Sequence, residues 1–411
     1  MRKTLKNILA FGTFWAVLLL IGCGSSSNDG SSAPTPTPTP ERVTFTGVGT
    51  HGIFDPSIAR DPSDPTGRLW MSYSAVDPSP MWSAQIADTD AIATRLAYSD
   101  DNGKTWIDSG AIVNNFLDVN FYPSLPSPYD AGTWVNEVSQ LIYDPNAIDA
   151  EKWKILWHHY LVLNRLPVDK RRLFENGWIA MKMASTPAGL AAAPEIKLFA
   201  GRIYNPDNNG VGTPPIQLNT LDLALKDCAV FTGPGMVAAA GALYLSLQCE
   251  AFDFTPLPPA LPVHINRLIV LLKCTGGSCG SAANWSYRGT VLQRSDATAF
   301  GFDDGLVDSG LFAAAGSVYL VVTPVQKVGA PWSDYYNGCY IFKFADIDTN
   351  PALLEKTGNQ PKLIGTVSGT TGSFNGACAY HASANSSGML YSELKPTVTD
   401  RFQMFMSHIN F

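Results

Sequence analysis

The sequence predicts an all-β fold, a five-bladed β-propeller in which an N-terminal strand closes the last blade. A hairpin-led unit recurs five times, which is typical of a small sheet repeated around an axis. Glycine (35 residues) and proline (29) are abundant and only 15% of residues are charged, which favours short strands and turns. The fifth unit ends early, after Arg401–Ser407, so we expect the strand-like segment Arg42–Gly47 to supply its outer strand and leave no open edge.

Each unit contains a short strand that leads to an aromatic residue. In the first unit a carboxylate opens the strand Phe54–Asp61, a turn rich in Asp, Pro and Gly follows, and Gly67–Tyr73 runs back. The pattern Gly-x-Leu/Val-aromatic then recurs, once with Lys in place of Gly. The aromatic markers lie 72 to 87 residues apart and are Trp70, Trp157, Tyr244, Tyr319 and Tyr391.

The first 41 residues predict export and a tether. Residues 1–22 combine a basic start with an apolar stretch, Ile8–Ile21, that is short for a membrane span. Leu20–Cys23 resembles a bacterial lipobox, which makes Cys23 the predicted lipidation site; the alternative is an ordinary secretory signal with a stray cysteine. Residues 23–41 are a Ser/Gly and Thr-Pro spacer, and 42–411 form the propeller. We therefore expect a lipid-anchored protein of the bacterial cell envelope, and Gly24 favours the outer membrane.

Cysteine and charge patterns limit the partners. Six cysteines remain after Cys23, and an even number in an exported protein indicates disulfides. No paired CxxC or histidine spacing supports a metal site. The formal charge is −7 and no basic run occurs, so we expect no nucleic-acid partner. We also expect a monomer that contacts the membrane only through its lipid anchor. The disulfide candidates are Cys228 with Cys249, Cys274 with Cys279, and Cys339 with Cys378.

The segment Ser99–Trp106 matches the Asp-box pattern S-x-D-x-G-x-T-W at every defining position. Its role is structural: Asp101 accepts backbone N–H groups, Gly103 adopts a conformation that few residues reach, and Trp106 packs between sheets. A degenerate copy is Thr275–Trp285. The box resembles those of sialidases, but the Arg-Ile-Pro that follows an aromatic residue in their first strand is absent here.

A second resemblance concerns the first two units. Asp55–Arg60 (DPSIAR) looks like the Asp-Pro-Ser-Ile/Val-x-Arg opening of glycoside hydrolase family 43, whose members are five-bladed propellers. Thr133–Val138 through Ile142–Asp144 and Leu156–Trp157 is similar to the family's second-blade pattern. The resemblance implies that Asp55 is the general base that activates water.

Hydrolysis with inversion also needs a general acid. The resemblance implies an Asp in the third blade and a catalytic Glu in the fourth. This chain has Gly233-Pro234-Gly235 at the third position, Asp308 at the fourth, and Tyr380-His381 at the fifth. The acid candidates are therefore Asp308, Glu137 and Glu250; alternatively, the pocket binds a sugar without cutting it.

Four residues are predicted to contact a substrate. His51 precedes Asp55 by four positions, Trp134 is a candidate for stacking on a sugar face, and Tyr380 and His381 open the fifth position. No cofactor is expected, although the resemblance leaves room for a structural calcium ion in the central channel, near His381.

Three functions follow from these patterns. The first is hydrolysis of a glycosidic bond, the second is non-catalytic glycan binding or scaffolding, and the third is a sialidase-like activity that needs three converging arginines. In each case the partner is a carbohydrate.

Overall fold

The structure, a computed structural model, describes residues 40–48, 52–76, 92–118, 131–163, 172–205, 214–253, 263–326, 335–370, 375–382, 387–395 and 402–409. These residues belong to one unit, Thr39–Phe411. The predicted leader and tether, with Cys23, lie outside the described residues, and so does His51. Among the described residues, no helix has the length and apolar character needed to cross a membrane.

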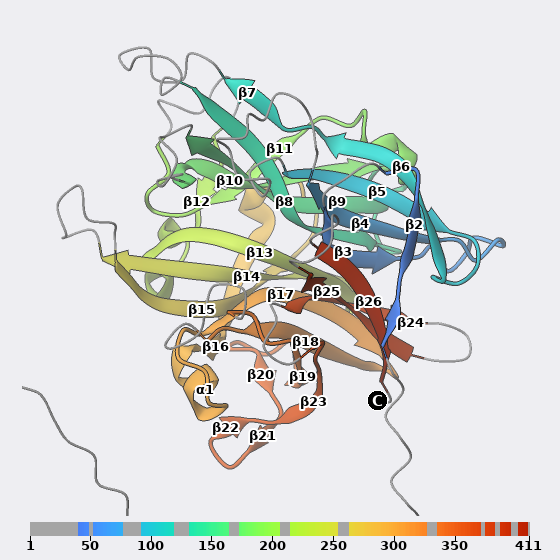
Figure 1. The fold of residues 1–411 in the computed structure, drawn as a ribbon. Helices are drawn as coiled ribbons and strands as arrows, with labels where there is room; N and C mark the ends of the chain where they lie inside the picture. The colour runs from blue at the N-terminus through green and yellow to red at the C-terminus, as the bar shows by residue number, and fades with distance from the viewer. Residues whose placement is uncertain are drawn as a thin grey trace, which may run out of the picture. The chain divides into compact units, whose positions relative to one another are not determined.

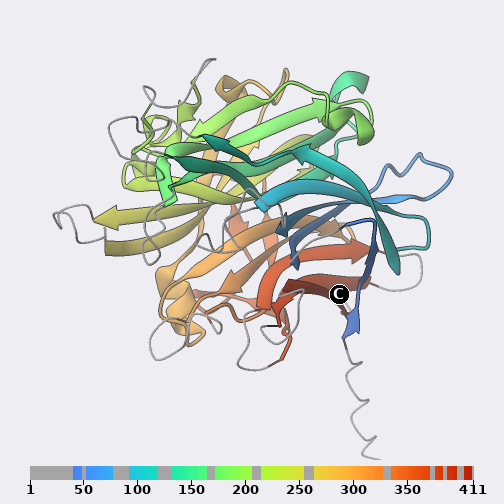
Figure 2. The same ribbon diagram turned by 45° about the horizontal axis from the view of Figure 1, so that its top comes forward.

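Five blades of mainly antiparallel strands follow one another around the fold (Figures 1 and 2), and a parallel pair between β26 and β3 joins blades 5 and 1 into one sheet. Their strands are, for blade 1, β3 (Gly52–Ala59), β4 (Leu69–Val76), β5 (Ile92–Ser99) and β6 (Thr105–Val113); for blade 2, β8 (Gly132–Tyr143), β9 (Trp153–Leu163), β10 (Arg172–Ala184) and β11 (Ile196–Ala200); for blade 3, β13 (Cys228–Ala239), β14 (Ala242–Asp253), β15 (Val263–Cys274) and β16 (Trp285–Gln293); for blade 4, β17 (Leu306–Ala314), β18 (Ser317–Pro324), β19 (Cys339–Asp346) and β23 (Leu363–Val367); and for blade 5, β24 (Asn375–Ala382), β25 (Ser387–Leu394) and β26 (Phe402–His408).

Shorter strands and helices lie outside these blade strands. They are the strands β1 (Glu41–Arg42), β2 (Thr44–Thr46), β7 (Phe116–Asp118), β12 (Ile216–Gln217), β20 (Leu353–Leu354), β21 (Lys356–Thr357) and β22 (Gln360–Pro361), the helix α1 (Arg294–Ala299), and the 3-10 helices η2 (Asp149–Glu151), η3 (Ala188–Leu190), η5 (Leu218–Thr220), η6 (Leu223–Leu225) and η7 (Ala282–Asn284).

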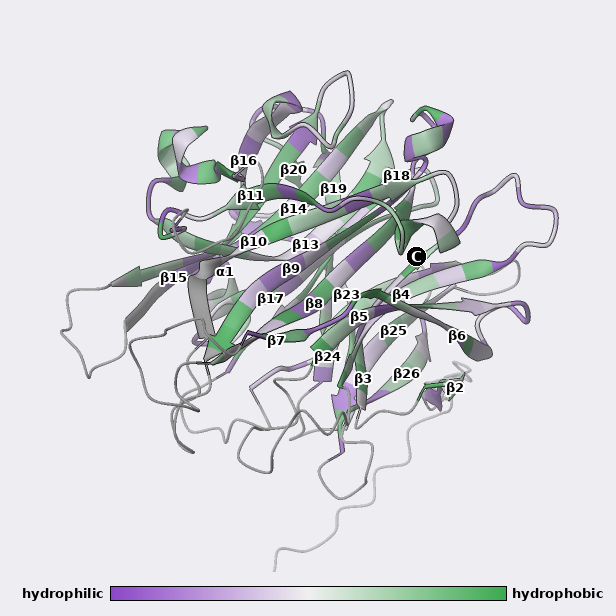
Figure 3. Ribbon diagram, turned by 90° about the horizontal axis from the view of Figure 1, so that it is seen from above, coloured by the Kyte–Doolittle hydropathy of each residue, from purple (hydrophilic) through white to green (hydrophobic). Residues whose placement is uncertain are grey.

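The first strands of the blades form a closed ring. β3 contacts β8, β8 contacts β13, β13 contacts β17, β17 contacts β24, and β24 contacts β3 again. Five hydrophobic clusters lie between the blades, and each joins side chains of two neighbouring blades. Figure 3 shows the corresponding hydrophobic stretches along the strands. Each blade therefore buries both faces, and the predicted five-bladed propeller is confirmed.

Every first strand contains a β-bulge at an equivalent place. The ladder with the second strand shifts register there, and one residue takes a positive φ. These residues are Asp55 (52°), Val138 (54°), Gly233 (54°), Asp308 (49°) and Ala377 (50°). The structural repeat is thus anchored at the bulge, and it places two aspartates at equivalent positions of blades 1 and 4.

The bulge corrects the predicted register in two blades. Trp70, Tyr244 and Tyr319 pair with residues four positions after the bulge. Trp157 and Tyr391 instead lie opposite the bulge, three residues out of phase. Both faces of a blade are buried, so an aromatic residue can pack at either position. The aromatic pattern therefore predicts the number of blades but not which residues are equivalent in them.

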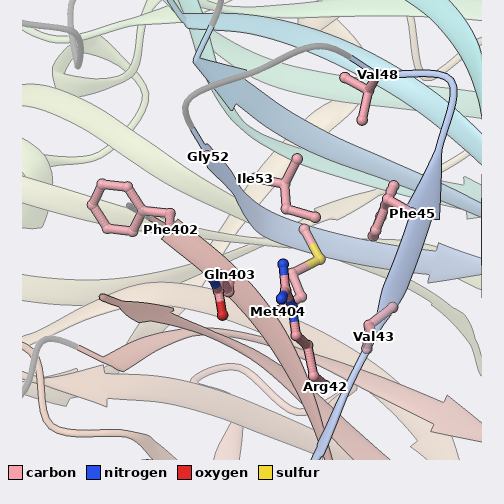
Figure 4. A pocket seen from close by; sticks show the side chains of 9 residues that line it. All are labelled: Arg42, Val43, Phe45, Val48, Gly52, Ile53, Phe402, Gln403 and Met404. Carbon is pink, nitrogen blue, oxygen red and sulfur yellow. The ribbon is translucent and has the colours of Figure 1, made fainter. Parts of the chain in front are cut away.

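The N-terminal segment closes the ring, although it divides between two blades. β1 pairs with β26 of blade 5, and Val43 N–H donates to Met404 O at 2.9 Å. β2 then pairs in parallel with β6 of blade 1. Figure 4 shows Phe45 facing Met404 across the small pocket between this segment, β3 and β26. The segment predicted as one outer strand is therefore two short strands that join the last blade to the first.

All three predicted disulfides are present. Cys228–Cys249 links the two inner strands of blade 3, Cys274–Cys279 closes a turn, and Cys339–Cys378 joins blades 4 and 5. The covalent links fall on the blades farthest from the N-terminal segment along the chain.

The Asp box also has its predicted contacts. Asp101 Oδ1 accepts Thr105 N–H at 2.9 Å, and the fully buried Trp106 donates its indole N–H to Gly103 O at 3.1 Å. In the degenerate copy Trp285 donates in the same way to Cys279 O, at 2.9 Å. Both turns join the third and fourth strands of a blade and serve packing.

We predict that Phe45→Ala lowers the free energy of unfolding by about 2 kcal/mol, because a half-buried ring is lost from the junction between blades 1 and 5. Phe45 packs against Tyr73, with ring centroids 5.0 Å apart. Urea unfolding of the soluble fragment measures the change, and the exposed Thr44→Ala on the same strand is the control. Equal stability of the two variants would contradict a role of this strand in closing the ring.

Candidate active site

Three carboxylates from the first strands of three blades interact near the axis; Asp55 and Glu137 are buried and Asp308 is half-buried. Asp55 (β3) and Asp308 (β17) occupy equivalent bulge positions, and Glu137 (β8) directly precedes the bulge of blade 2. All three belong to first strands, which line the centre of the ring. Asp55 interacts electrostatically with both Asp308 and Glu137, so residues far apart in sequence form one acidic cluster.

Asp55 is held toward blade 2. Its Oδ2 accepts the Ser74 hydroxyl at 2.8 Å and the Val138 backbone N–H at 3.2 Å. The pKa of Asp55 is raised well above its usual value, chiefly by burial and then by the negative charges of Asp308 and Glu137. The two hydrogen bonds act in the opposite direction, because they favour the ionised form of Asp55.

Asp308 lacks such support for a charge. Burial and the negative charges of Glu137 and Glu250 raise its pKa to about 7, against the opposing effect of Arg267. Its backbone N–H donates to Gln248 Oε1 at 3.1 Å. The two aspartates disfavour each other's ionisation, so the pair retains a proton near neutral pH, and only Asp55 accepts hydrogen bonds from Ser74 and Val138 that stabilise a charge.

The other two acid candidates are engaged differently. Tyr160 donates its hydroxyl to Glu137 Oε1 at 2.5 Å. Arg267 donates Nε–H to Glu250 Oε1 at 2.7 Å and also bonds Asp304. Glu250 is therefore engaged in an ion pair within blade 3.

Two substrate-binding predictions, for Trp134 and His381, are corrected by the structure. Trp134 is 5% exposed, and its ring stacks on His159 with centroids 5.0 Å apart, so it belongs to the core and has no open face for a sugar. The bulge of blade 5 is at Ala377, so Tyr380 and His381 lie beyond the position predicted for them. Tyr380 stacks on Phe312, with centroids 4.4 Å apart, and both line a cavity formed by the first strands of all five blades, so its contact with a substrate stays a prediction.

His381 belongs to a blade junction. It is 4% exposed and lies against the Asp-box turn, where a Cβ added to Gly103 would be 2.7 Å from its Nε2. Burial lowers its pKa. This position does not fit a channel-bound calcium ion, and among the described residues no group of three His, Cys, Asp or Glu side chains is arranged to hold a metal. The calcium ion stays a prediction without support from this histidine.

Sequence reasoning missed the polar residues of the second strands that hold the bulges. Each accepts the N–H of the bulge in the following blade. They are Ser392 for Asp55 (3.2 Å), Ser74 for Val138 (3.2 Å), Gln248 for Asp308 (3.1 Å) and Thr323 for Ala377 (3.0 Å). A polar residue within an apolar second strand was the available signal, but only the bulge register aligns the four.

No family model matches the sequence, and a comparison with curated proteins gives no match. Several solved structures are similar in fold. A thermostable family-43 glycoside hydrolase is 12% identical, with a TM-score of 0.49 over 88% of this chain and 90% of its own. An endo-arabinase from Bacteroides thetaiotaomicron is 11% identical, with a TM-score of 0.44 over 90% and 98% of the two chains.

A third similar structure is an arabinoxylan arabinofuranohydrolase of family 43 from Bacillus subtilis, in complex with cellotetraose. It is 14% identical, with a TM-score of 0.47 over 87% of this chain and 63% of its own. The assignment of five blades rests on the ring of strands and bulges in this chain itself.

We predict that Asp308→Asn removes a pH-dependent loss of stability. With a pKa raised from 3.8 to about 7, Asp308 favours the folded state fully below about pH 4, and this contribution is lost as the pH rises to about 7. Asparagine imitates the protonated acid, so the variant should unfold at nearly the wild-type urea concentration at pH 4.5. At pH 8 it should be more stable than wild type by about 2 kcal/mol or more. Parallel stability curves across this range would show that Asp308 is not buried among other carboxylates.

Proposed function

We propose that this protein hydrolyses a glycosidic bond in a carbohydrate bound at the axis of the propeller. The observation that carries the proposal is the pair Asp55 and Asp308. They lie at equivalent bulges; Asp55 is supported as a carboxylate by two hydrogen bonds, and the pKa of Asp308 is raised to about 7 by burial and by the charges of Glu137 and Glu250. A glycosidase needs this combination of a base and an acid.

In the proposed mechanism Asp55 accepts a proton from water as the water oxygen attacks the anomeric carbon. Asp308 donates its proton to the leaving oxygen as the glycosidic bond breaks. The anomeric configuration inverts, and exchange with solvent then returns Asp308 to its protonated form and Asp55 to its ionised form. This geometry requires about 6.5–9.5 Å between the two carboxyl groups, which leaves room for the water. Glu137 assists by raising the proton affinity of Asp308.

Two further features belong to the proposal. The three disulfides support export to an oxidising compartment, which agrees with a leader that ends at Cys23 and with a lipid-anchored protein of the cell envelope. A sialidase-like site would need arginines that can hold a substrate carboxylate. Within the described residues Arg95 is paired with Asp108 and Arg267 with Glu250, so these two guanidinium groups are already engaged.

We predict that Asp55→Asn and Asp308→Asn each lower kcat/KM at least about 100-fold, because each removes one proton-transfer group. A panel of plant and microbial polysaccharides, tested with the soluble fragment 42–411, identifies the substrate, and NMR of the first product shows whether the anomer inverts. Asp100→Asn is the control, since Asp100 is an exposed carboxylate paired with Arg68 in blade 1. Unchanged hydrolysis by Asp55→Asn would remove the assigned base, and binding without hydrolysis would favour a non-catalytic glycan-binding propeller.

The pH dependence of the reaction provides a second test. As the pH rises through about 7, Asp308 loses the proton that it must donate, so kcat/KM should fall with a slope of one per pH unit on a logarithmic scale. Initial rates between pH 4 and 9 on the identified substrate measure this limb. An activity that keeps rising to pH 9 would contradict Asp308 as the acid.

A further inference from the structure

Gln248 joins the proposed acid to a neighbouring salt bridge. It lies on β14, the second strand of blade 3, and is 4% exposed. Its Oε1 accepts the Asp308 N–H at 3.1 Å, and its Nε2 donates to Glu250 Oε1. Rotating the amide by 180° would set its NH₂ group against the N–H and its oxygen against the carboxylate. The two contacts therefore fix a single orientation of the side chain.

The salt bridge also holds the chain just before Asp308. Arg267 on β15 donates Nε–H to Glu250 at 2.7 Å and Nη1–H to the backbone oxygen of Asp304 at 2.8 Å. Asp304 lies four residues before Asp308. Blade 3 thus contacts this segment of blade 4 at two points, the Asp308 N–H and the Asp304 backbone oxygen. Gln248 and Arg267, which make these contacts, both bond Glu250.

A missing side chain makes space for Gln248. Gly233 occupies the bulge of blade 3, the position where the family resemblance implies a carboxylate. A Cβ added to Gly233 would lie 3.3 Å from Asp308 Cα and 3.4 Å from Gln248 Oε1, tighter than an ordinary contact at both atoms. In blade 3 the Gln248 amide, from the second strand, therefore lies beside Asp308 where the resemblance implies a carboxylate from the first strand.

The charged groups around Asp308 come from three other blades. Asp55 lies on β3, Glu137 on β8, and Glu250 and Arg267 on the second and third strands of blade 3. Three of the four are negative. The Nε2–H of Gln248 points at one of these, Glu250, and offsets part of its charge.

We propose that Gln248 is a positioning residue that holds the backbone of Asp308 and, through Glu250, sets how tightly Asp308 keeps its proton. The inference rests on the proposed function. In Gln248→Thr the hydroxyl should still accept the Asp308 N–H, but it is too short to contact Glu250. Thr323, at the equivalent position of blade 4, accepts the next bulge N–H in this way, at 3.0 Å. Methionine, which is similar in length to glutamine, loses both contacts.

The experiment measures two midpoints. The first is that of the Asp308 carboxyl in a ¹³C NMR titration, whose signal is assigned by its absence in Asp308→Asn. The second is that of the alkaline limb of the pH–rate profile. In Gln248→Thr the Glu250 charge is less offset and repels an ionised Asp308 more strongly. Both midpoints should therefore rise by about 0.5 pH unit or more, with kcat affected more than KM. Gln248→Met should show this shift together with a loss of stability, since it leaves the buried Asp308 N–H without an acceptor.

Thr323→Val is the matched control. It removes the acceptor of the Ala377 N–H at a boundary whose bulge has no carboxylate, so stability should fall and both midpoints should stay in place. An Asp308 midpoint in Gln248→Thr that equals the wild-type value would overturn the proposal, as would an equal shift in Thr323→Val. Because the titration needs no substrate, this result is separate from any failure of Asp55→Asn or Asp308→Asn to affect hydrolysis.

Discussion

The structure depends on one hydrogen bond that recurs between blades. At the bulge of a first strand the backbone turns into the left-handed region, and the N–H of that residue leaves its own ladder. Burying this N–H without an acceptor would cost about 1–3 kcal/mol. A hydroxyl or amide on the second strand of the preceding blade accepts it at four of the blade boundaries. The bond therefore sets the register of each blade against the next.

The same constraint creates the acidic cluster. A bulge aims its side chain differently from the regular strand on either side, and at the axis this brings residues of separate blades together. Aspartate tolerates a positive φ better than most residues, which suits Asp55 and Asp308 to this position. The cost of placing them there appears as raised pKa values, and it is partly offset by Ser74 and Arg267. Such stored electrostatic strain is typical of catalytic sites.

Much of the fold was predictable because its signals are local. A turn and a short apolar strand identify a blade wherever they occur, and an even set of cysteines in an exported chain indicates disulfides. The DPSIAR segment likewise made Asp55 the candidate general base, which stays a prediction. The substrate-binding residues were harder, because Trp134 and His381 look the same in sequence whether they face a pocket or a core. Trp134 is covered by His159, and His381 by the Asp-box turn of another blade.

By itself the sequence determined the number of blades, the presence of disulfides and the presence of acidic residues at the strand openings of blades 1 and 4, since these follow from composition and from patterns of neighbours along the chain. The tertiary structure alone decided which carboxylates meet, which of them is paired with Arg267, and that Gln248 reaches Asp308 across 60 residues of sequence. A proton affinity depends on burial and on charges a few ångströms away. Those distances exist only after the ring has closed.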